Sequence, residues 1–243
     1  AIFVPHVGCP QHCSFCNQHT ITGDAVLPTP AAVQEAASIA ARSLGAGVGQ
    51  GELAFFGGSF TAIDRGYMEL LLGTASECVK LYGFMGIRIS TRPDAVGSEV
   101  LYTLQRYGVT AIELGAQSMD DQVLALNKRG HTAAQTEEAA VRIRGMGFEL
   151  GLQMMTGLYG DTDERALATA DKLIALQPST MRVYPTGGLP GTGLAELYSQ
   201  GIYTPQGLEE AVALCAQLLE RFQGAGVRVI RMGLHAQQEV EAR

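Results

Sequence analysis

The 243-residue chain has no tryptophan and few charged residues (17%), and it lacks the features that mark several classes of protein. No apolar run approaches the roughly 20 residues that a membrane-spanning helix needs. No signal peptide precedes the first apolar segment, so we expect a cytoplasmic protein without membrane contact. With 17 Lys and Arg against 24 Asp and Glu, the net charge is −7. A broad basic surface for nucleic acid is therefore not expected, although a local basic patch or an additional domain could still supply contacts to nucleic acid.

Apolar residues make up 47% of the chain and glycine is plentiful at 30 residues, which suits a sizeable core joined by many tight turns. No linker, internal repeat or low-complexity segment divides the sequence. We therefore expect one domain over residues 1–243. The chain begins at Ala1, within an apolar run and without a methionine, which indicates a trimmed or partial sequence.

Short apolar runs alternate with longer helical patterns, which is typical of βαβ units and a parallel sheet. The predicted strands are 2–5, 53–56, 87–90, 111–114, 150–154, 181–184 and 227–230. The predicted helices are 31–44, 67–82, 98–107, 132–146, 163–176 and 208–223. Six or seven such units are too few for a closed eight-fold barrel.

Polar and glycine-rich segments follow nearly every predicted strand. A barrel gathers its active site from all of its strand ends, whereas an open doubly wound sheet concentrates it at one switch point. The sequence therefore predicts an α/β fold with a partial (β/α)6 TIM-like barrel. The segments in question are Cys9, 57–59, 90–92, 117–118, Gly157 and Pro185.

Three of the five cysteines, Cys9, Cys13 and Cys16, fall within eight residues. An odd number of cysteines crowded in this way does not form a disulfide framework and indicates a cytosolic metal site. Soft thiolates suit an iron–sulfur cluster, whereas a closed zinc site needs four ligands. Three protein ligands would leave one iron of a [4Fe–4S] cluster with an open position, as a catalytic metal requires.

The Cys-x3-Cys-x2-Cys spacing, with Phe15 before the last cysteine and a strand before the first, resembles the radical S-adenosylmethionine (SAM) superfamily. Residues 2–17 are most similar to its branch with the Elongator catalytic subunit and the oxygen-independent coproporphyrinogen oxidases. In that superfamily the open iron binds SAM, and one electron splits the sulfonium to give a 5′-deoxyadenosyl radical that abstracts a substrate hydrogen. The resemblance implies a [4Fe–4S] cluster, SAM, and an electron donor such as flavodoxin or ferredoxin.

The resemblance also assigns roles at the second and third strand ends. Gly57 and Gly58 match the motif that holds the methionine amine of SAM, and Ser59 stands where many members have a glutamate. Ser90 and Thr91 match positions that bind the ribose. Without the resemblance, a glycine pair after a strand indicates no more than a tight turn.

Further roles fall on the fourth and fifth strands. Glu113 and Gln117 share one face of a strand, where burying both is costly unless they have partners. Gln117 and Arg129 match positions that contact the nucleoside and the methionine carboxylate. Gln153 would face the ribose, and the Gly157 segment would cradle adenine.

Several alternatives stay open on the residues alone. Arg92 could form a turn ion pair with Asp94 instead of serving the site. His131 could donate a proton, but a helix cap is the simpler expectation. Tyr184 is a candidate at the cofactor and substrate side, or else a core tyrosine. The cysteines could instead hold zinc, completed by His6, His12 or His19.

The predicted function is a radical SAM enzyme that abstracts hydrogen from an unknown substrate. The chain has no room for the acetyltransferase domain of Elongator-like proteins or for the substrate domain of coproporphyrinogen oxidases. The substrate could therefore be tRNA, a metabolite or a protein side chain. The alternatives are a non-catalytic relative that binds a cluster, SAM or haem, and a zinc-binding interaction module.

Overall fold

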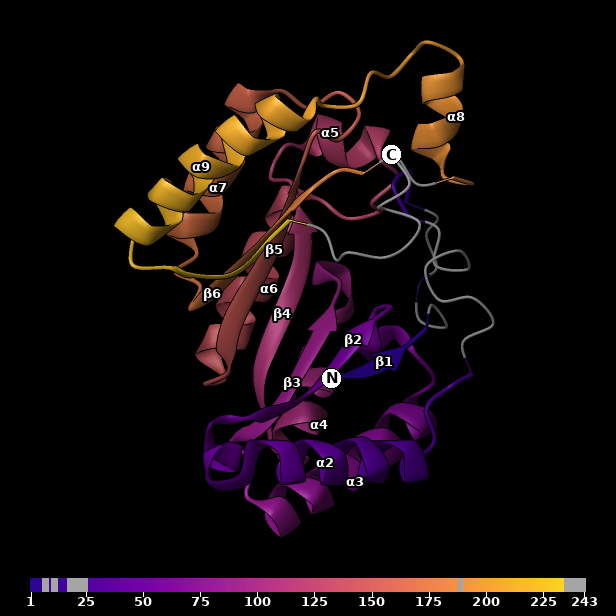
Figure 1. The fold of residues 1–243 in the computed structure, drawn as a ribbon, viewed down its shortest axis with the longest axis vertical. Helices are drawn as coiled ribbons and strands as arrows, with labels where there is room; N and C mark the ends of the chain where they lie inside the picture. Colours follow the sequence, from indigo (N-terminus) through magenta and orange to yellow (C-terminus); the bar gives the residue numbers. More distant parts are fainter. Residues whose placement is uncertain (6–8, 10–12, 17–25, 188–189, 234–243) are drawn as a thin grey trace.

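A single sheet of seven parallel strands organises the computed structural model, which describes residues 1–5, 9, 13–16, 26–187 and 190–233 (Figure 1). The strands lie side by side in the order of the sequence, β1 to β7. Their bounds are β1 (Ile2–Val4), β2 (Glu52–Gly57), β3 (Gly86–Thr91), β4 (Val109–Gln117), β5 (Glu149–Thr156), β6 (Thr180–Pro185) and β7 (Arg228–Met232).

The sheet is curled but not closed, because β1 and β7 are its two edges (Figure 1). Every neighbouring pair of strands is parallel, from Ile2 beside Phe55 at one edge to Val183 beside Met232 at the other. Parallel neighbours need crossover connections, and helices supply them here. The prediction of a partial barrel is confirmed, with six crossovers joining the seven strands.

The six predicted helices are present, with ends that differ by at most two residues from the prediction. Several begin at a side-chain cap, for example at Thr29, Asp64 and Thr162. The part of the chain that the structure describes has two further helices, α5 and α8, too short to give a periodic pattern. The helices are α2 (Pro30–Leu44), α3 (Arg65–Tyr82), α4 (Ser98–Arg106), α5 (Asp121–Leu126), α6 (Ala133–Gly145), α7 (Asp163–Ala175), α8 (Gly193–Ser199) and α9 (Leu208–Gly224).

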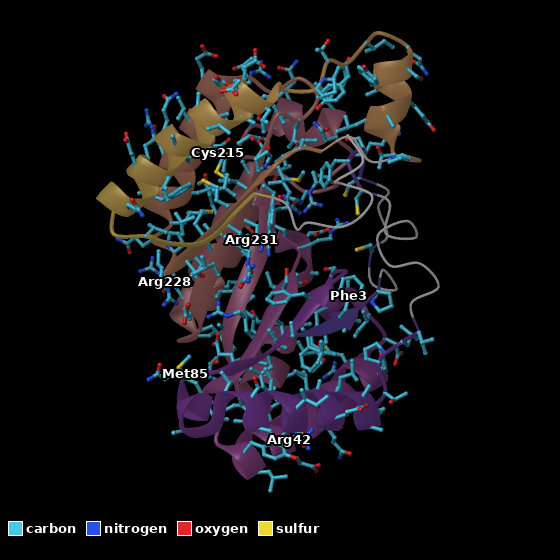
Figure 2. The ribbon with its side chains drawn as sticks, viewed as in Figure 1. Phe3, Arg42, Met85, Cys215, Arg228 and Arg231 are labelled. Carbon is cyan, nitrogen blue, oxygen red and sulfur yellow. The ribbon has the colours of Figure 1, made fainter. Side chains whose placement is uncertain are left out.

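The hydrophobic core lies between the sheet and the helices that cover its convex side. Fully buried strand residues such as Phe55, Ile112 and Leu152 face these helices. Cys215 on α9 is buried in the same layer (Figure 2). Within the described ranges, no helix combines the length and the apolar character that crossing a membrane requires.

The concave face of the sheet is polar, because alternate strand residues point away from the core. Arg88 on β3 and Arg182 on β6 lie on this face, and both contact Glu113 on β4. Phe3 on β1 and Arg231 on β7 come from the two edges of the sheet (Figure 2). The fold thus leaves a polar inner face beside the ends of the strands.

Candidate active site

A cavity of about 430 Å³ lies at the carboxyl ends of the strands. Residues from the loop after β1 and from the ends of β2, β3, β4 and β5 line it together, as a barrel-type site requires. The predicted site residues in its lining are Cys9, Cys13, Phe15, Cys16, Gly57, Gly58, Ser59, Ser90, Thr91, Gln117, Arg129 and Gln153.

The loop that carries the three cysteines, here called the cysteine loop, is held by residues far along the chain. Its centre, Ser14, is buried, and its backbone nitrogen donates to the Asn127 carbonyl at 3.1 Å. The Ser14 hydroxyl donates to the Asn127 side-chain oxygen at 2.7 Å. On the other side, the Leu194 nitrogen at the start of α8 donates to the Ser14 carbonyl at 2.8 Å. The loop is therefore anchored between α5 and α8.

Asn127 is fully buried and joins three parts of the site. Its side-chain nitrogen donates to the carbonyls of Val123 (2.8 Å) and Tyr159 (2.9 Å). Its side-chain oxygen accepts from the Tyr159 nitrogen at 3.3 Å as well as from Ser14. Asn127 was not predicted to belong to the site, although it precedes Arg129 by only two residues. In the sequence it is an ordinary amide next to residues that resemble a binding motif.

Arg129 lies against the cysteine loop and is only 6% exposed. Its guanidinium donates to the Gly115 carbonyl at 2.6 Å and to the Cys13 sulfur at 3.1 Å. The same group lies over the Phe15 ring, 5.7 Å from its centroid. Its Nε is buried without a hydrogen-bond partner, and so is the side-chain oxygen of Gln117 in the same cavity. Buried polar atoms without partners are costly, so a ligand that pairs with both would be favoured here.

Two non-glycine residues in this cavity have left-handed backbone conformations. Gln117 has φ +67° at a register shift between β4 and β5, and Lys128 has φ +54°. Such conformations cost roughly 1–2 kcal/mol each for residues other than glycine and gather at functional sites. The chain therefore stores strain around the Arg129 segment.

Gly57 closes the cavity at the end of β2, with φ +119°. A Cβ atom at this position would lie 2.2 Å from the Val4 carbonyl oxygen and 2.9 Å from the Phe3 ring. The Gly58 nitrogen donates to the same Val4 carbonyl at 2.9 Å. Only glycine fits at position 57, so bare backbone faces the cavity.

The hydroxyl residues after β2 and β3 bond to one another. The Ser59 and Thr91 hydroxyls are 2.8 Å apart, and both residues are buried. Thr91 also meets the Thr61 hydroxyl at 2.6 Å. Arg92 is bound by both Asp94 oxygens, at 2.9 and 2.6 Å, which is the turn ion pair that the sequence left open. Burial opposes ionisation of Asp94, but Arg92 outweighs it and lowers the pKa of that carboxyl below its usual value.

Glu113 lies behind the cavity and does not line it. It is 1% exposed and accepts from Arg182 at 2.7 and 3.2 Å and from the Gln153 amide at 3.0 Å. The Gln153 nitrogen also donates to the Ser90 hydroxyl at 3.3 Å. Because its nitrogen is occupied, Gln153 can offer its amide oxygen to a ligand that donates hydrogen bonds.

Two other predicted site residues lie outside the lining of this cavity. Gly157 borders a second cavity of about 440 Å³, and its carbonyl accepts from the Tyr203 hydroxyl at 2.6 Å. Tyr184 is half-buried near the end of β6, two residues after Arg182, whose guanidinium lies 5.0 Å from the Phe56 ring centroid. Gly157 and Tyr184 are therefore not among the residues that line the cavity with the cysteines.

His131 is buried, and its Nε2 lies 3.2 Å from the Ala116 carbonyl. Burial lowers its pKa to about 4, assisted by the positive charge of Arg129. The expectation that His131 caps a helix is wrong, because Thr132 is the N-cap of α6. The Thr132 hydroxyl accepts a hydrogen bond from the backbone nitrogen of Gln135, the third residue of the helix. The imidazole of His131 instead points toward β4.

The cavity lining also includes eight residues that were not predicted to belong to the site. Four of them come from α8 and the segment before it, which has no counterpart in the predicted helices. Glu196 and Lys128 bring opposite charges to the lining. The unselected lining residues are Ser14, Arg92, Gly115, Lys128, Gly191, Thr192, Gly193 and Glu196.

The donor set fits a cluster better than a single metal ion. In the described ranges, no three His, Cys, Asp or Glu side chains are placed to share one ion. Each cysteine of a [4Fe–4S] cluster binds a different iron, so the three thiolates need not converge on one point, and Cys9, Cys13 and Cys16 all line this cavity. The residues that would complete a zinc site, His6, His12 and His19, lie outside the described residues.

Comparison with known proteins identifies the family. The radical SAM superfamily model matches residues 3–173, and the radical SAM C-terminal domain model matches residues 178–242. The chain belongs to the radical SAM superfamily, whose members use a [4Fe–4S] cluster and SAM. This family match decides between the cluster and the zinc alternative in favour of the cluster.

Similar proteins place the chain near the expected branch. It is 27% identical over 238 residues to a tRNA uridine(34) acetyltransferase of Dehalococcoides mccartyi, covering 84% of this chain and 52% of the relative. It is 30% identical over 198 residues to human Elongator complex protein 3, covering 73% and 36%. The chain thus spans about half the length of these relatives or less.

Two solved structures support the fold. An N-terminally truncated Elp3 from Methanocaldococcus infernus superimposes with a TM-score of 0.74 at 20% identity, covering 99% of this chain and 59% of that one. Coproporphyrinogen III oxidase from Escherichia coli gives 0.63 at 18% identity, covering 93% and 52%. The predicted resemblance to Elongator-like proteins is confirmed by the relatives, and both superpositions support the predicted fold.

Proposed function

We propose that this chain is the radical-generating core of a tRNA-modifying enzyme, which reductively cleaves SAM and abstracts hydrogen from a tRNA-linked substrate. The observation that carries the proposal is the convergence of Cys9, Cys13 and Cys16 with the ends of β2 to β5 on one cavity. When bound, the cluster and SAM supply a 5′-deoxyadenosyl radical, which protein side chains alone do not provide.

The role of each residue follows from its chemistry and from its place in the cavity. The Arg129 Nε is a buried, unpaired cationic donor, suited to the carboxylate of SAM. The bare backbone at Gly57 and Gly58 suits its ammonium group, through carbonyl acceptors. The amide oxygens of Gln117 and Gln153 suit the donor groups of the nucleoside and ribose.

Other predicted residues act beside the cavity in this proposal. Glu113 holds the Gln153 amide in one orientation. The hydroxyls of Ser59 and Thr91 shape the turn that Gly58 begins. Ser90 contributes through its bond to Gln153, and Gly157 and Tyr184 are assigned to the adenine and substrate sides.

The tRNA-linked substrate is supported by the names of the relatives and not by contacts within the cavity. The chain carries a net charge of −7, so phosphate contacts would depend on parts of the longer relatives that this chain does not match. A flavodoxin or ferredoxin would supply the electron. A cytoplasmic setting is supported by five free cysteines, and residues 1–243 would act as one domain around one sheet.

The test uses protein reconstituted anaerobically with iron and sulfide. We expect four irons per chain and release of 5′-deoxyadenosine from SAM under dithionite. Cys13→Ala should abolish release, whereas Cys78→Ala, which alters a buried cysteine of α3, should retain it. Unmodified tRNA is then added to ask whether release becomes faster.

A protein that binds one zinc and no cluster would refute the proposal. So would a stable cluster that never cleaves SAM. Cleavage that tRNA does not accelerate, with this chain or with a full-length homologue, would refute only the substrate.

A further inference from the structure

The guanidinium of Arg129 contacts the sulfur of a proposed cluster ligand, which is a different contact from the one its Nε could make with SAM. The Nη1 atom donates to the Cys13 sulfur at 3.1 Å. The nitrogen that makes this bond and the unpaired Nε belong to the same planar group. One side chain can therefore serve the cluster and the cofactor at the same time.

The position of this guanidinium is set by groups other than the cysteine. Nη2 donates to the Gly115 carbonyl at 2.6 Å, and the backbone nitrogen of Arg129 donates to the Leu124 carbonyl at 3.0 Å. The Phe15 ring lies below the guanidinium at 5.7 Å. With 6% of the residue exposed, the side chain has little freedom to withdraw from Cys13.

Another arginine, Arg92, also lies near the cysteines, and its positive charge interacts with Cys13 and Cys9. Asp94 binds it at 2.6 Å and offsets that charge. Among the described residues, no carboxylate pairs with Arg129. The uncompensated guanidinium beside the cysteine loop is therefore the one that touches a sulfur.

A cluster held by three thiolates becomes more negative when it takes up one electron, because [4Fe–4S]²⁺ is reduced to [4Fe–4S]⁺. A hydrogen bond from a cation to a ligand sulfur stabilises the more negative state. Hydrogen bonds to the sulfurs, net charge and exposure to solvent are what set the potentials of such clusters. Burial strengthens the effect, since water and salt screen a buried charge weakly.

We propose that Arg129 raises the reduction potential of the cluster through its hydrogen bond to Cys13, and so makes the cluster easier to reduce. Arg129 is a positioning residue in this role and need not touch the substrate. The inference rests on the proposed function, because it requires the cluster to be present. It goes beyond that function by assigning Arg129 an effect that exists without SAM.

The experiment measures the potential of the reconstituted full chain in the absence of SAM. Dithionite supplies the electron through redox mediators, and the signal of the reduced cluster is followed by electron paramagnetic resonance. In Arg129→Gln we expect the ratio of reduced to oxidised cluster at a fixed potential to fall about tenfold, or about 59 mV for one electron. Arg129→Lys, a fallback that keeps the charge, should shift in the same direction by less.

Lys128→Gln is the matched control. It removes a positive charge from the adjacent residue in the same cavity. Within the described part of the chain, the side chain that donates to a cysteine sulfur is that of Arg129 and not that of Lys128. Its ratio should stay within twofold of the wild type.

A loaded Arg129→Gln or Arg129→Lys protein with four irons per chain and an unchanged potential would overturn the inference. An equal shift in Lys128→Gln would overturn it as well, because charge alone would then suffice. Failure of the wild type to hold a cluster would instead refute the proposed function, so the two outcomes are distinguishable.

Discussion

Ser14 and Asn127 are joined twice, once through their backbones at 3.1 Å and once through their side chains at 2.7 Å. Ser14 lies between two of the proposed cluster ligands, Cys13 and Cys16, while Asn127 ends α5. The shape of the cysteine loop therefore depends on a residue from the middle of the chain. An amide whose four hydrogen-bonding positions are all occupied is also sensitive to any change.

Asn127→Ala should weaken both the fold and the cluster. It leaves the Ser14 hydroxyl and two backbone groups of Tyr159 without their partner, at roughly 1–3 kcal/mol for each buried group that stays unpaired. We expect a lower free energy of unfolding in urea and fewer than four irons per chain. Gln105→Ala, which loses an exposed bond to Met146, should stay within about 0.5 kcal/mol of the wild type. Full iron loading of Asn127→Ala would contradict this anchoring role.

Gly57→Ala should be among the most damaging single methyl additions. The new Cβ would meet the Val4 carbonyl at 2.2 Å and would also sit in a backbone region that favours glycine. We expect a loss of at least about 2 kcal/mol in unfolding free energy, together with weaker SAM binding measured by calorimetry. Gly47→Ala, where no heavy atom lies within 4 Å, is the matched control and should be nearly neutral. Equal stability of the two variants would show that position 57 accepts a side chain.

Glu113→Leu should destabilise the concave face. Glu113 is the carboxylate that Arg182 binds with two nitrogens, and Arg88 lies 3.6 Å away. Removing one partner of a buried ion pair typically costs about 3–5 kcal/mol, because the other charge stays buried. The measurement is urea unfolding, with Glu138→Leu as control. Glu138 pairs with Arg142 on an exposed helix face, where the loss should be about 0.5 kcal/mol. A similar loss in both variants would contradict the assigned burial cost.

Acid should destabilise the protein through His131. Its folded pKa of about 4 lies below the ordinary 6.5, so the unfolded chain binds more protons between these values. This contribution is fully present above pH 6.5 and is lost as the pH falls toward 4, by about 2 kcal/mol between pH 7 and 5. Asp161 acts in the opposite sense, because burial raises its pKa to about 6.

The variant His131→Gln separates the two contributions, since Asp161 is present in both proteins. The difference in unfolding free energy between the wild type and His131→Gln should shrink by about 2 kcal/mol from pH 7 to pH 5. Arg129, Arg92 and Asp94 also face His131, and all three are present in both proteins. A difference that stays constant with pH would show that the imidazole does not stay neutral in the folded protein.

The alternation of strands and helices, and with it the parallel sheet, could be predicted from the sequence. Buried parallel strands such as Leu53–Phe56 are apolar on both faces, and the long helices repeat their apolar residues at helical spacing. Helices α5 and α8, with six and seven residues, were not predicted, because they are shorter than two full helical turns and give no periodic pattern. Their contacts with the cysteine loop join residues that are far apart in the chain, so no local pattern records them.

The parts of the candidate site that could be predicted are those in which residue type and spacing indicate the chemistry. The cysteines, the Gly57-Gly58 pair and Gln153 belong to this group, and they line one cavity. The placement of Glu113 behind Gln153 could not be foreseen, because it depends on which strand face points inward and on Arg182 two strands away. Asn127 and Glu196 were missed because each is ordinary in its local sequence and becomes important only through tertiary contact.

The anchoring of Ser14 has a consequence for the order of events during synthesis. The three cysteines leave the ribosome before Asn127, which lies 113 residues after Ser14, and Leu194 comes later still. Until both have emerged, the cysteine loop lacks the hydrogen bonds that give it its shape. Assembly of the proposed cluster would therefore follow the synthesis of Leu194, and a ribosome that stalls before this residue would leave the three thiols without these hydrogen bonds.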